Sequence, residues 1–296
     1  MTSQLTVGRV WWHASRPATL AASISPVLVG LGVAAHLGRV SPLRTLGVLV
    51  VAVAIQFGVN YANDYSDFAR GADGPGRTGP PRAASSGLVP PRRVLYAAVG
   101  AFLIAAIVGL WLCSQTDWWL VAVGAVCILA AWLYTGGPWP YGYRGLGEIS
   151  VFIFFGLVAT CGTVVIETGR LDLLAVLAGI LPGSLAASLL LVNNIRDRAQ
   201  DEAVGKRTLA VILGAAGARR LLFGLLGLAL AVPLFITIPG IETFTLFLPW
   251  LAAPLMEAPV RNSASADPAD QVRALKQMGG VLAISSVLLA LGIWAG

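Results

Sequence analysis

The sequence has few charged residues, few histidines and few cysteines, and each shortage excludes a class of protein. Only 11% of the 296 residues are charged while 57% are hydrophobic, which is more apolar surface than a soluble domain of this length buries. The three cysteines form no CxxC pair and the two histidines are far apart, so a disulfide framework, a zinc site and a haem-ligating pair are not expected. The composition indicates an α-helical protein that crosses a membrane several times.

Long apolar runs divide the chain into nine predicted membrane spans. They are expected at residues 18–37, 45–60, 94–113, 118–134, 147–166, 171–192, 219–238, 243–256 and 279–295. The eighth is short and bounded by prolines. We therefore predict an all-α, polytopic membrane protein in which residues 1–296 form a single transmembrane domain.

Lysine and arginine are unevenly shared between the two sides that a nine-span topology defines. Seventeen of the twenty fall on the side of the N-terminus, and only Arg39, Arg44 and Arg170 fall on the other. Because the cytoplasmic loops of membrane proteins carry the excess of lysine and arginine, the N-terminus is predicted in the cytoplasm and the C-terminus outside. The net charge of +6 follows from these loops, so nucleic acid is not an expected partner.

Two clusters of acidic residues and asparagines follow apolar runs on the side predicted to be cytoplasmic, at residues 60–73 and 193–201. Within each cluster the spacing is three or four residues, which places the side chains on one face of a helix. The residues concerned are Asn60, Asp64, Asp67 and Asp73 in the first cluster, and Asn193, Asp197 and Asp201 in the second. Asp73 lies beyond the helix-breaking Gly71.

Carboxylates beside a bilayer core are costly and are found mostly at functional sites. Mg²⁺ prefers oxygen ligands and is usually held by one or two carboxylates together with substrate phosphates. Two facing acidic clusters therefore predict a site for a magnesium-bridged lipid diphosphate. Ordinary loop acids near helix ends are the simpler alternative, and a transporter is the main alternative that is not an enzyme, because transporters also keep acids within the membrane.

Basic and aromatic residues complete the predicted site. Lys206 follows the second cluster and Arg82 lies in the Gly- and Pro-rich loop after the first, and either is able to bind phosphate oxygens. A third segment, residues 134–148, contains tyrosines that either stack on a flat substrate or anchor the chain at the membrane interface. These are Tyr134, Tyr141 and Tyr143, and the same segment contains Arg144 and Glu148, which are spaced to pair on a helix.

These motifs resemble those of the intramembrane aromatic prenyltransferases, the UbiA superfamily, and the resemblance covers nearly the whole chain. The matching motifs are Asn60-x-x-Asn-Asp64-x-x-Asp67 and Asn193-x-x-x-Asp197-x-x-x-Asp201. Residues 134–148 and 206–211 make the chain most similar to the branch that prenylates 1,4-dihydroxy-2-naphthoate. The first motif departs from that of many relatives, since its last aspartate comes three residues on and not four.

The resemblance implies nine transmembrane helices around a central cavity, with a cytoplasmic cap formed by the loops after the second and sixth spans. It implies transfer of a polyprenyl group from its diphosphate to 1,4-dihydroxy-2-naphthoate, with loss of CO₂ and pyrophosphate, to give demethylmenaquinone in menaquinone biosynthesis at the cell membrane. Another aromatic acceptor, such as 4-hydroxybenzoate or homogentisate, is the alternative.

The resemblance also assigns roles to individual residues. It implies that Mg²⁺ binds Asp64, Asp67, Asp197 and Asp201, with Asp73 as either an additional ligand or a residue of the phosphate-binding loop. It implies that the diphosphate contacts Asn60, Asn193, Lys206, Arg82 and Arg144. The same four metal-binding aspartates would carry the catalysis, and Tyr134, Tyr141 and Tyr143 would contact the aromatic substrate.

Overall fold

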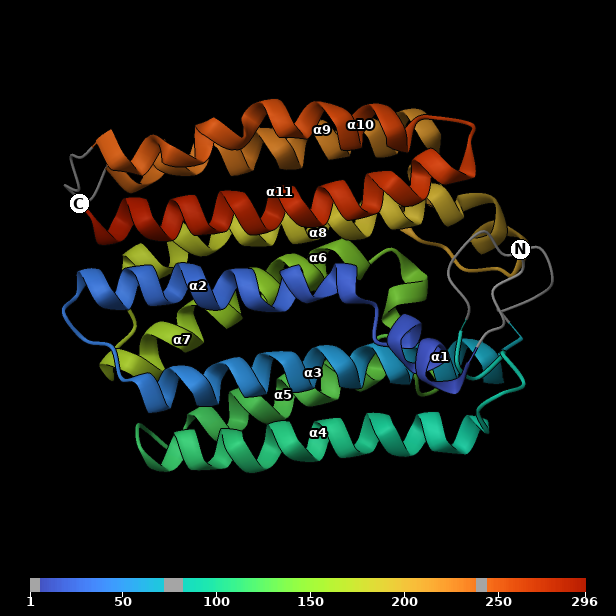
Figure 1. Cartoon of the computed structure of the whole chain (residues 1–296), viewed down its shortest axis with the longest axis horizontal. Coiled ribbons are helices and arrows are strands. Elements are labelled where there is room, and N and C mark those ends of the chain that lie inside the picture. Colours follow the sequence, from blue (N-terminus) through green and yellow to red (C-terminus); the bar gives the residue numbers. More distant parts are fainter. Residues whose placement is uncertain (1–5, 72–81, 238–243) are drawn as a thin grey trace.

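The computed structural model describes residues 6–71, 82–237 and 244–296, and in these ranges every regular element is a helix. The helices run roughly parallel to one another, with α1 at one end of the molecule and the end of α11 at the other (Figure 1). The long helices are α2 (Leu20–His36), α3 (Pro42–Ala69), α4 (Pro91–Ser114), α8 (Leu173–Ala203), α9 (Leu209–Thr237) and α11 (Pro268–Trp294).

Shorter elements fill the remaining positions. They are α1 (Val7–Ala14), η1 (Pro17–Thr19), α5 (Leu120–Leu133), η2 (Tyr141–Arg144), α6 (Gly147–Phe152), the π-helix η3 (Ile153–Val158), α7 (Ala159–Thr168), η4 (Phe244–Met256) and α10 (Glu257–Ser263). α6, η3 and α7 follow one another without a break and together act as one long helix.

All nine predicted spans coincide with helical segments, but only seven helical stretches of the described chain are long and apolar enough to cross a membrane. The prediction at 118–134 corresponds to α5, which has only 14 residues. The prediction at 243–256 corresponds to η4, a 3₁₀ helix in which Pro249 and Pro254 remove backbone donors. The multi-pass, all-helical architecture is therefore confirmed, whereas the count of nine spans is not, because seven helical stretches of the described residues have the length and hydropathy of a span.

Two helices continue well past the apolar runs that predicted them. α3 extends to Ala69 and α8 to Ala203, so Asn60, Asp64, Asp67 and the whole second cluster lie on the last turns of helices. The interval of residues 193–218 between the sixth and seventh predicted spans was expected to be a loop, and it is mostly helical, because only residues 204–208 separate α8 from α9. The length of an apolar run matches the thickness of the membrane, but a helix can extend beyond the membrane until a residue ends it. Here Gly71 and Gly205, with φ of 69° and 74°, lie just after the ends of α3 and α8.

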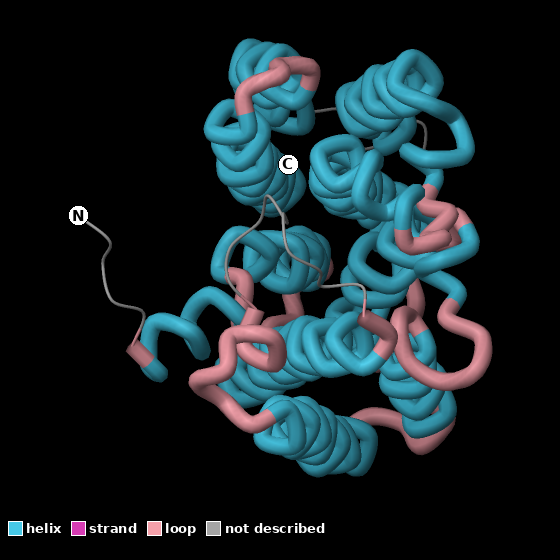
Figure 2. The backbone as a smooth tube through the Cα atoms, turned by 90° about the vertical axis from the view of Figure 1, so that its right-hand side faces the viewer, coloured by secondary structure: helices cyan, strands magenta, loops and turns pink. Residues whose placement is uncertain are grey.

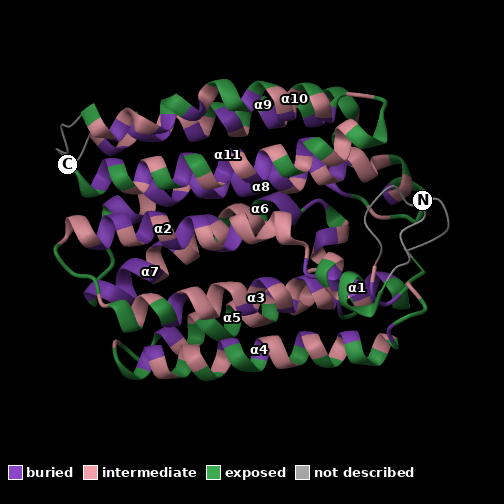
Figure 3. Ribbon diagram, viewed as in Figure 1, coloured by how far each residue is buried: buried purple, intermediate pink, exposed green. Residues whose placement is uncertain are grey.

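α8 lies at the centre of the bundle. In its most apolar stretch 78% of the residues are buried, against 22% for α3 and for α4, and it packs against α9, α11, α6 and α2. Figure 3 shows the same contrast, with buried positions concentrated on α8 and exposed ones along α4. α4 therefore leaves much of its apolar surface exposed, including Leu103, Ile104 and Ile107.

A small cap covers α3 at the α1 end of the molecule. Side chains of α1 pack against residues that follow Arg82, and the cluster consists of Val10, Ala14, Ala83, Ala84, Val89 and Val94. Trp11 contacts the ring of Tyr61 edge to face, with 5.5 Å between centroids. Figure 2 views the bundle from this end, with the helices end-on and connecting loops in front of them. A cap after the second predicted span is therefore present, and α1 is part of it.

Candidate active site

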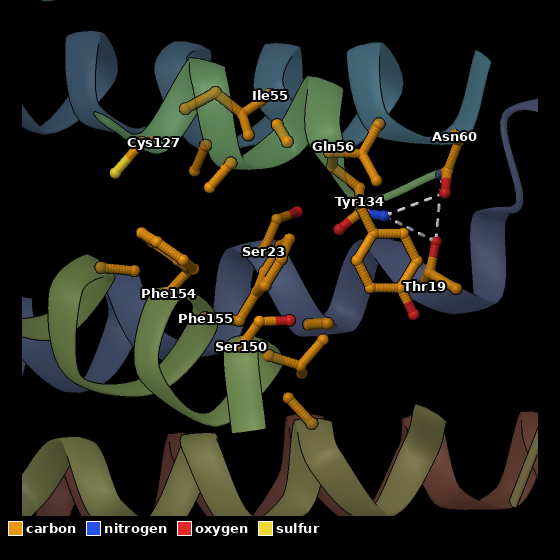
Figure 4. A pocket seen from close by; sticks show the side chains of 18 of the residues that line it. Thr19, Ser23, Ile55, Gln56, Asn60, Cys127, Tyr134, Ser150, Phe154 and Phe155 are labelled. Atoms are coloured by element: carbon orange, nitrogen blue, oxygen red, sulfur yellow. Dashed lines mark hydrogen bonds between the residues drawn. The ribbon is translucent and has the colours of Figure 1, made fainter. Parts of the chain in front are cut away.

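A cavity of about 830 Å³ lies within the bundle, with a polar end and an apolar end. At the α1 end its wall includes Asp67, Arg82, Asn193, Asp197 and Lys206. Toward the opposite end the wall is formed by side chains of α4, α5 and α7, among them Leu112, Cys113, Leu120, Val121 and Ile166. Figure 4 shows the transition, with Asn60, Gln56 and Thr19 at one side of the view and Cys127 and Phe154 at the other.

Asp64 ties the chain after Arg82 to α3. It is fully buried, and its two oxygens accept hydrogen bonds from the backbone N–H groups of Ala83, at 2.8 Å, and Ala84, at 3.1 Å. Both oxygens predicted to bind metal are thus engaged by backbone, and Asp64 does not line the cavity. Its role as a metal ligand stays a prediction.

Asp67 lies one turn further along α3 and faces the cavity. Its Oδ2 accepts from Nη2 of Arg82 at 3.0 Å, and its Oδ1 accepts from the hydroxyl of Tyr143 at 2.6 Å. Two residues that the sequence singled out in separate segments therefore meet on this carboxylate. The arrangement also brings Arg82 to the cavity wall, where it was predicted.

Asn60 holds the chain that precedes α2. Its Nδ2 donates to the carbonyl of Ser15 at 2.8 Å and to the Thr19 hydroxyl at 3.2 Å. Gln56, one turn earlier, donates to Thr19 and to Oδ1 of Asn60 (Figure 4). Asn60 lines the cavity, but its amide is engaged in positioning η1, and its predicted contact with the diphosphate stays a prediction.

The second acidic motif is organised by a neighbouring arginine. Arg196 donates to both oxygens of Asp197 at 2.6 Å and to Oδ1 of Asn193 at 2.8 Å. Asn193 in turn donates to Asp197 at 3.3 Å. All three residues line the cavity, so the helical spacing correctly placed Asn193 and Asp197 on one face.

Asp201 forms an ion pair with Lys206, with 3.3 Å between Oδ1 and Nζ. Its other oxygen is buried and has no hydrogen-bond partner among the described residues. The tight link between α8 and α9 produces this pair, since the Lys206 N–H also donates to the Asp201 carbonyl at 2.8 Å. Lys206 lines the cavity and Asp201 lies behind it.

Tyr143 connects the two acidic motifs. Its hydroxyl donates to Asp67, and Nζ of Lys206 lies 5.2 Å from the centre of its ring, within the range of cation–π attraction. Burial, and secondarily the charge of Asp67, raises the pKa of Tyr143, so its hydroxyl remains a donor at neutral pH. The segment between α5 and α6 thus spans from α3 to the start of α9.

The other two predicted tyrosines form part of the cavity wall. Tyr134 and Tyr141 meet edge to face, with 5.5 Å between ring centroids, and Tyr141 donates to the carbonyl of Ala130 at 2.9 Å. Burial raises the pKa of Tyr141, and an ordinary tyrosine, with a pKa of about 10, is neutral at pH 7. Both are therefore wall residues of the cavity, and their contact with a substrate stays a prediction.

Arg144 lies apart from the cavity. Its guanidinium lies 3.7 Å from the ring centre of Trp139, and it does not line the cavity wall. The pair that its spacing from Glu148 suggested is not formed, because Glu148 is buried and accepts from Nδ2 of Asn194 at 2.9 Å. The helical spacing does not apply to these two residues, because Arg144 lies in η2 and Gly145, with φ of 76°, separates it from α6. Asp73 falls outside the described residues.

The donor chemistry of the site fits magnesium, although the described residues include no group of three histidine, cysteine or acidic side chains placed to hold a metal. Asp67 and Asp197 present carboxylate oxygens to one cavity, and one oxygen of Asp201 is buried without a partner. Mg²⁺ needs only one or two carboxylates when a substrate supplies phosphate oxygens. The residues therefore suit a metal that binds together with a diphosphate.

Sequence reasoning missed several residues of the site. Arg16 lines the cavity and is the single described residue other than glycine with positive φ, at 50°, and such strained backbone is concentrated at functional sites. Arg196 and the pair Glu148–Asn194 were also missed. Arg196 could have been found, because an arginine within an Asn-x-x-Arg-Asp helix lies beside both neighbours.

Comparisons with known proteins give one consistent result. The family model described as "UbiA prenyltransferase family" matches residues 23–279. The chain is 43% identical to the 1,4-dihydroxy-2-naphthoate octaprenyltransferase of Mycobacterium tuberculosis, over 96% of this chain and 94% of the relative. It is 32% identical to the protein of that name from Escherichia coli, over 98% of this chain and 97% of the relative.

Solved structures support the fold independently of sequence. A UbiA homolog from Aeropyrum pernix superposes with a TM-score of 0.67 at 15% identity, covering 92% of this chain and 96% of the homolog. A UbiA homolog from Archaeoglobus fulgidus bound to DMAPP and Mg²⁺ gives a TM-score of 0.65 at 12% identity, covering 95% and 99%. At such low identity these matches establish a shared arrangement of helices.

Proposed function

This chain belongs to the UbiA prenyltransferase family, and from that premise we propose that it transfers a polyprenyl group from polyprenyl diphosphate to 1,4-dihydroxy-2-naphthoate. CO₂ and pyrophosphate leave, and the product is demethylmenaquinone, a menaquinone precursor. The curated relatives named for this acceptor support the choice, and they match over almost the full length of the chain.

One observation carries the proposal, namely that a single cavity combines a charged end with a long apolar wall. Lys206, Arg82 and Arg196 bring positive charge to the end where a diphosphate would lie. Small and apolar side chains of α4, α5 and α7 line the rest, which suits an isoprenoid tail. A transporter does not require cations and carboxylates gathered at one end of a largely apolar cavity.

We propose that Asp67, Asp197 and Asp201 hold Mg²⁺ together with the bound diphosphate. The metal would neutralise negative charge on the leaving pyrophosphate. In the structure these carboxylates are paired with Arg82, Arg196 and Lys206. Binding of the substrate would let the same cations turn to phosphate oxygens, because each lies on the cavity wall. Asp64 and Asn60 would keep the surrounding segments in place.

Residues of the cavity would meet three needs of the reaction: stabilising the leaving diphosphate, stabilising the prenyl cation and excluding water. Lys206 and Arg82 stabilise the diphosphate as the bond to the prenyl carbon breaks. Tyr134 and Tyr141 line the cavity with neutral rings, which attract a cationic prenyl group without reacting with it. The apolar wall excludes water that would otherwise capture the cation before the electron-rich acceptor does.

We propose that the protein lies in the cell membrane and that its α1 end faces the cytoplasm. The three arginines assigned to the opposite side do lie there, and two of them cap α7: Arg39 donates to the carbonyl of Thr168 and Arg44 to that of Ile166. In the sequence the other seventeen basic residues fall in segments assigned to the side of the N-terminus, which supports a cytoplasmic face there by the positive-inside rule.

A turnover assay tests the proposal. The purified full chain in detergent is incubated with polyprenyl diphosphate, Mg²⁺ and 1,4-dihydroxy-2-naphthoate, and prenylated quinol and pyrophosphate are measured. Product is expected with this acceptor in preference to 4-hydroxybenzoate and homogentisate, and removal of metal by a chelator should stop turnover reversibly. Preference for another acceptor would correct the substrate, and no product with any acceptor would refute prenyl transfer.

A further inference from the structure

Glu148 is a buried acid for which the proposed reaction, as described above, gives no role. Its side chain is only 3% exposed. Oε1 accepts from Nδ2 of Asn194 at 2.9 Å, and Oε2 has no hydrogen-bond partner among the described residues. A carboxyl group buried in this way is costly unless it serves a purpose.

The contact fixes the orientation of the Asn194 amide. A carboxylate accepts hydrogen bonds and cannot donate them, so the nitrogen of Asn194 must face Glu148. Asn194 lines the cavity and Glu148 does not. With its nitrogen directed toward Glu148, the group that Asn194 offers to the cavity is its oxygen, which is a hydrogen-bond acceptor.

The position of Asn194 indicates what this oxygen contacts. Asn194 precedes Asp197 by three residues on α8, which is about 4.5 Å along the helix axis and in the direction away from Asp201 and Lys206. Tyr134 and Tyr141 line the same cavity. An amide oxygen repels phosphate oxygens and accepts from a hydroxyl, so it suits a hydroxylated ring better than a diphosphate.

We propose that Glu148 is a positioning residue that turns the Asn194 oxygen into the cavity, where it accepts a hydrogen bond from a ring hydroxyl of the aromatic acceptor. This inference rests on the proposed transfer to a dihydroxylated aromatic acid and adds a subsite to it. Glu148 acts through Asn194 and does not touch the substrate.

Steady-state kinetics on the full chain in detergent tests the inference. Glu148→Leu releases the amide, and it should raise KM for 1,4-dihydroxy-2-naphthoate about tenfold, the effect of losing one hydrogen bond. KM for polyprenyl diphosphate and the Mg²⁺ concentration for half-maximal rate should stay within about twofold, since neither ligand contacts Asn194 in this scheme. Glu148→Gln, which keeps an acceptor oxygen, should remain within about threefold of the parent.

Two further comparisons isolate the role of Asn194. Asn194→Leu should reproduce the rise in acceptor KM, and the double variant with Glu148→Leu should be no worse than Asn194→Leu alone. Methylating the naphthoate hydroxyl that contacts Asn194 should raise the acceptor KM of the parent protein. The same methylation should leave the acceptor KM of Asn194→Leu unchanged. Glu167→Gln is the matched control, because Glu167 is also buried but bonds to Ser41 and Thr45 away from the cavity.

Several outcomes would overturn the inference. Equal losses for acceptor, diphosphate and Mg²⁺ would show that Asn194 belongs to the diphosphate site. A fall in kcat for Glu148→Gln at unchanged KM would show that the charge of Glu148 matters and not the amide orientation. If Glu148→Leu does not fold, Asn194→Leu and Glu148→Gln still decide the question. Absence of turnover in the parent protein would instead refute the proposed function.

Discussion

The sharpest test of the site concerns Asp64, because the sequence and the structure suggest different roles for it. The motif suggests a metal ligand, whereas the structure has both of its oxygens bound to the backbone of Ala83 and Ala84. We predict that Asp64→Asn impairs the enzyme mainly by releasing residues 82–90. Arg82 directly precedes these two donors, so its contact with Asp67 would be lost with them.

The magnitude follows from the two bonds. A hydrogen bond to a charged group contributes about 1.5–3 kcal/mol, so the aspartate stabilises the local structure by roughly 3–6 kcal/mol. Asparagine keeps one acceptor and turns an NH₂ group toward the other N–H, which loses at least one of the bonds. The ratio of closed to open forms of the segment should therefore fall about 10- to 150-fold.

Hydrogen exchange and kinetics together check this prediction. In Asp64→Asn, amide exchange over residues 82–90 should accelerate, and kcat/KM for polyprenyl diphosphate should fall by a similar factor. Asp172→Asn is the matched control, because Asp172 caps α8 at the opposite end and asparagine caps a helix equally well. If Asp64→Asn leaves amide exchange at Ala83 and Ala84 unchanged but needs more Mg²⁺ for half-maximal rate, Asp64 is a direct ligand and the reasoning is refuted.

Three further predictions concern other parts of the structure. Tyr143→Phe removes the 2.6 Å bond to Asp67 but keeps the ring beside Lys206, so kcat/KM should fall about tenfold; an unchanged value would mean that Tyr143 does not couple the two motifs. Lys206→Ala should raise KM for the diphosphate at least about tenfold, with partial recovery in Lys206→Arg, and initial rates at varied diphosphate decide this. A methyl group on Gly156 would collide with the backbone of Gly183, so Gly156→Ala should destabilise the bundle by about 1–3 kcal/mol; an unchanged thermal midpoint in detergent would contradict it.

Some features of the site were predictable because they depend on residues close together in sequence. Asn193 and Asp197 share a helical face, and Lys206, within the short connection after α8, pairs with Asp201 five residues earlier. Helical periodicity and short connections determine such contacts almost regardless of the rest of the fold. The length of the helices was less predictable, since α3 and α8 continue beyond the apolar runs by which their ends were predicted.

The sequence by itself determined that the chain is a bundle of apolar helices with two acidic motifs at one end, because hydropathy and helical spacing are local properties. Only the tertiary structure decided that Tyr143 bonds Asp67 across 76 residues, that Asp64 holds backbone, and that Glu148 pairs with Asn194 rather than with Arg144. These choices depend on which helices pack together and how they are rotated. A buried polar group then takes whichever partner the packing brings within reach, since leaving it without one is costly.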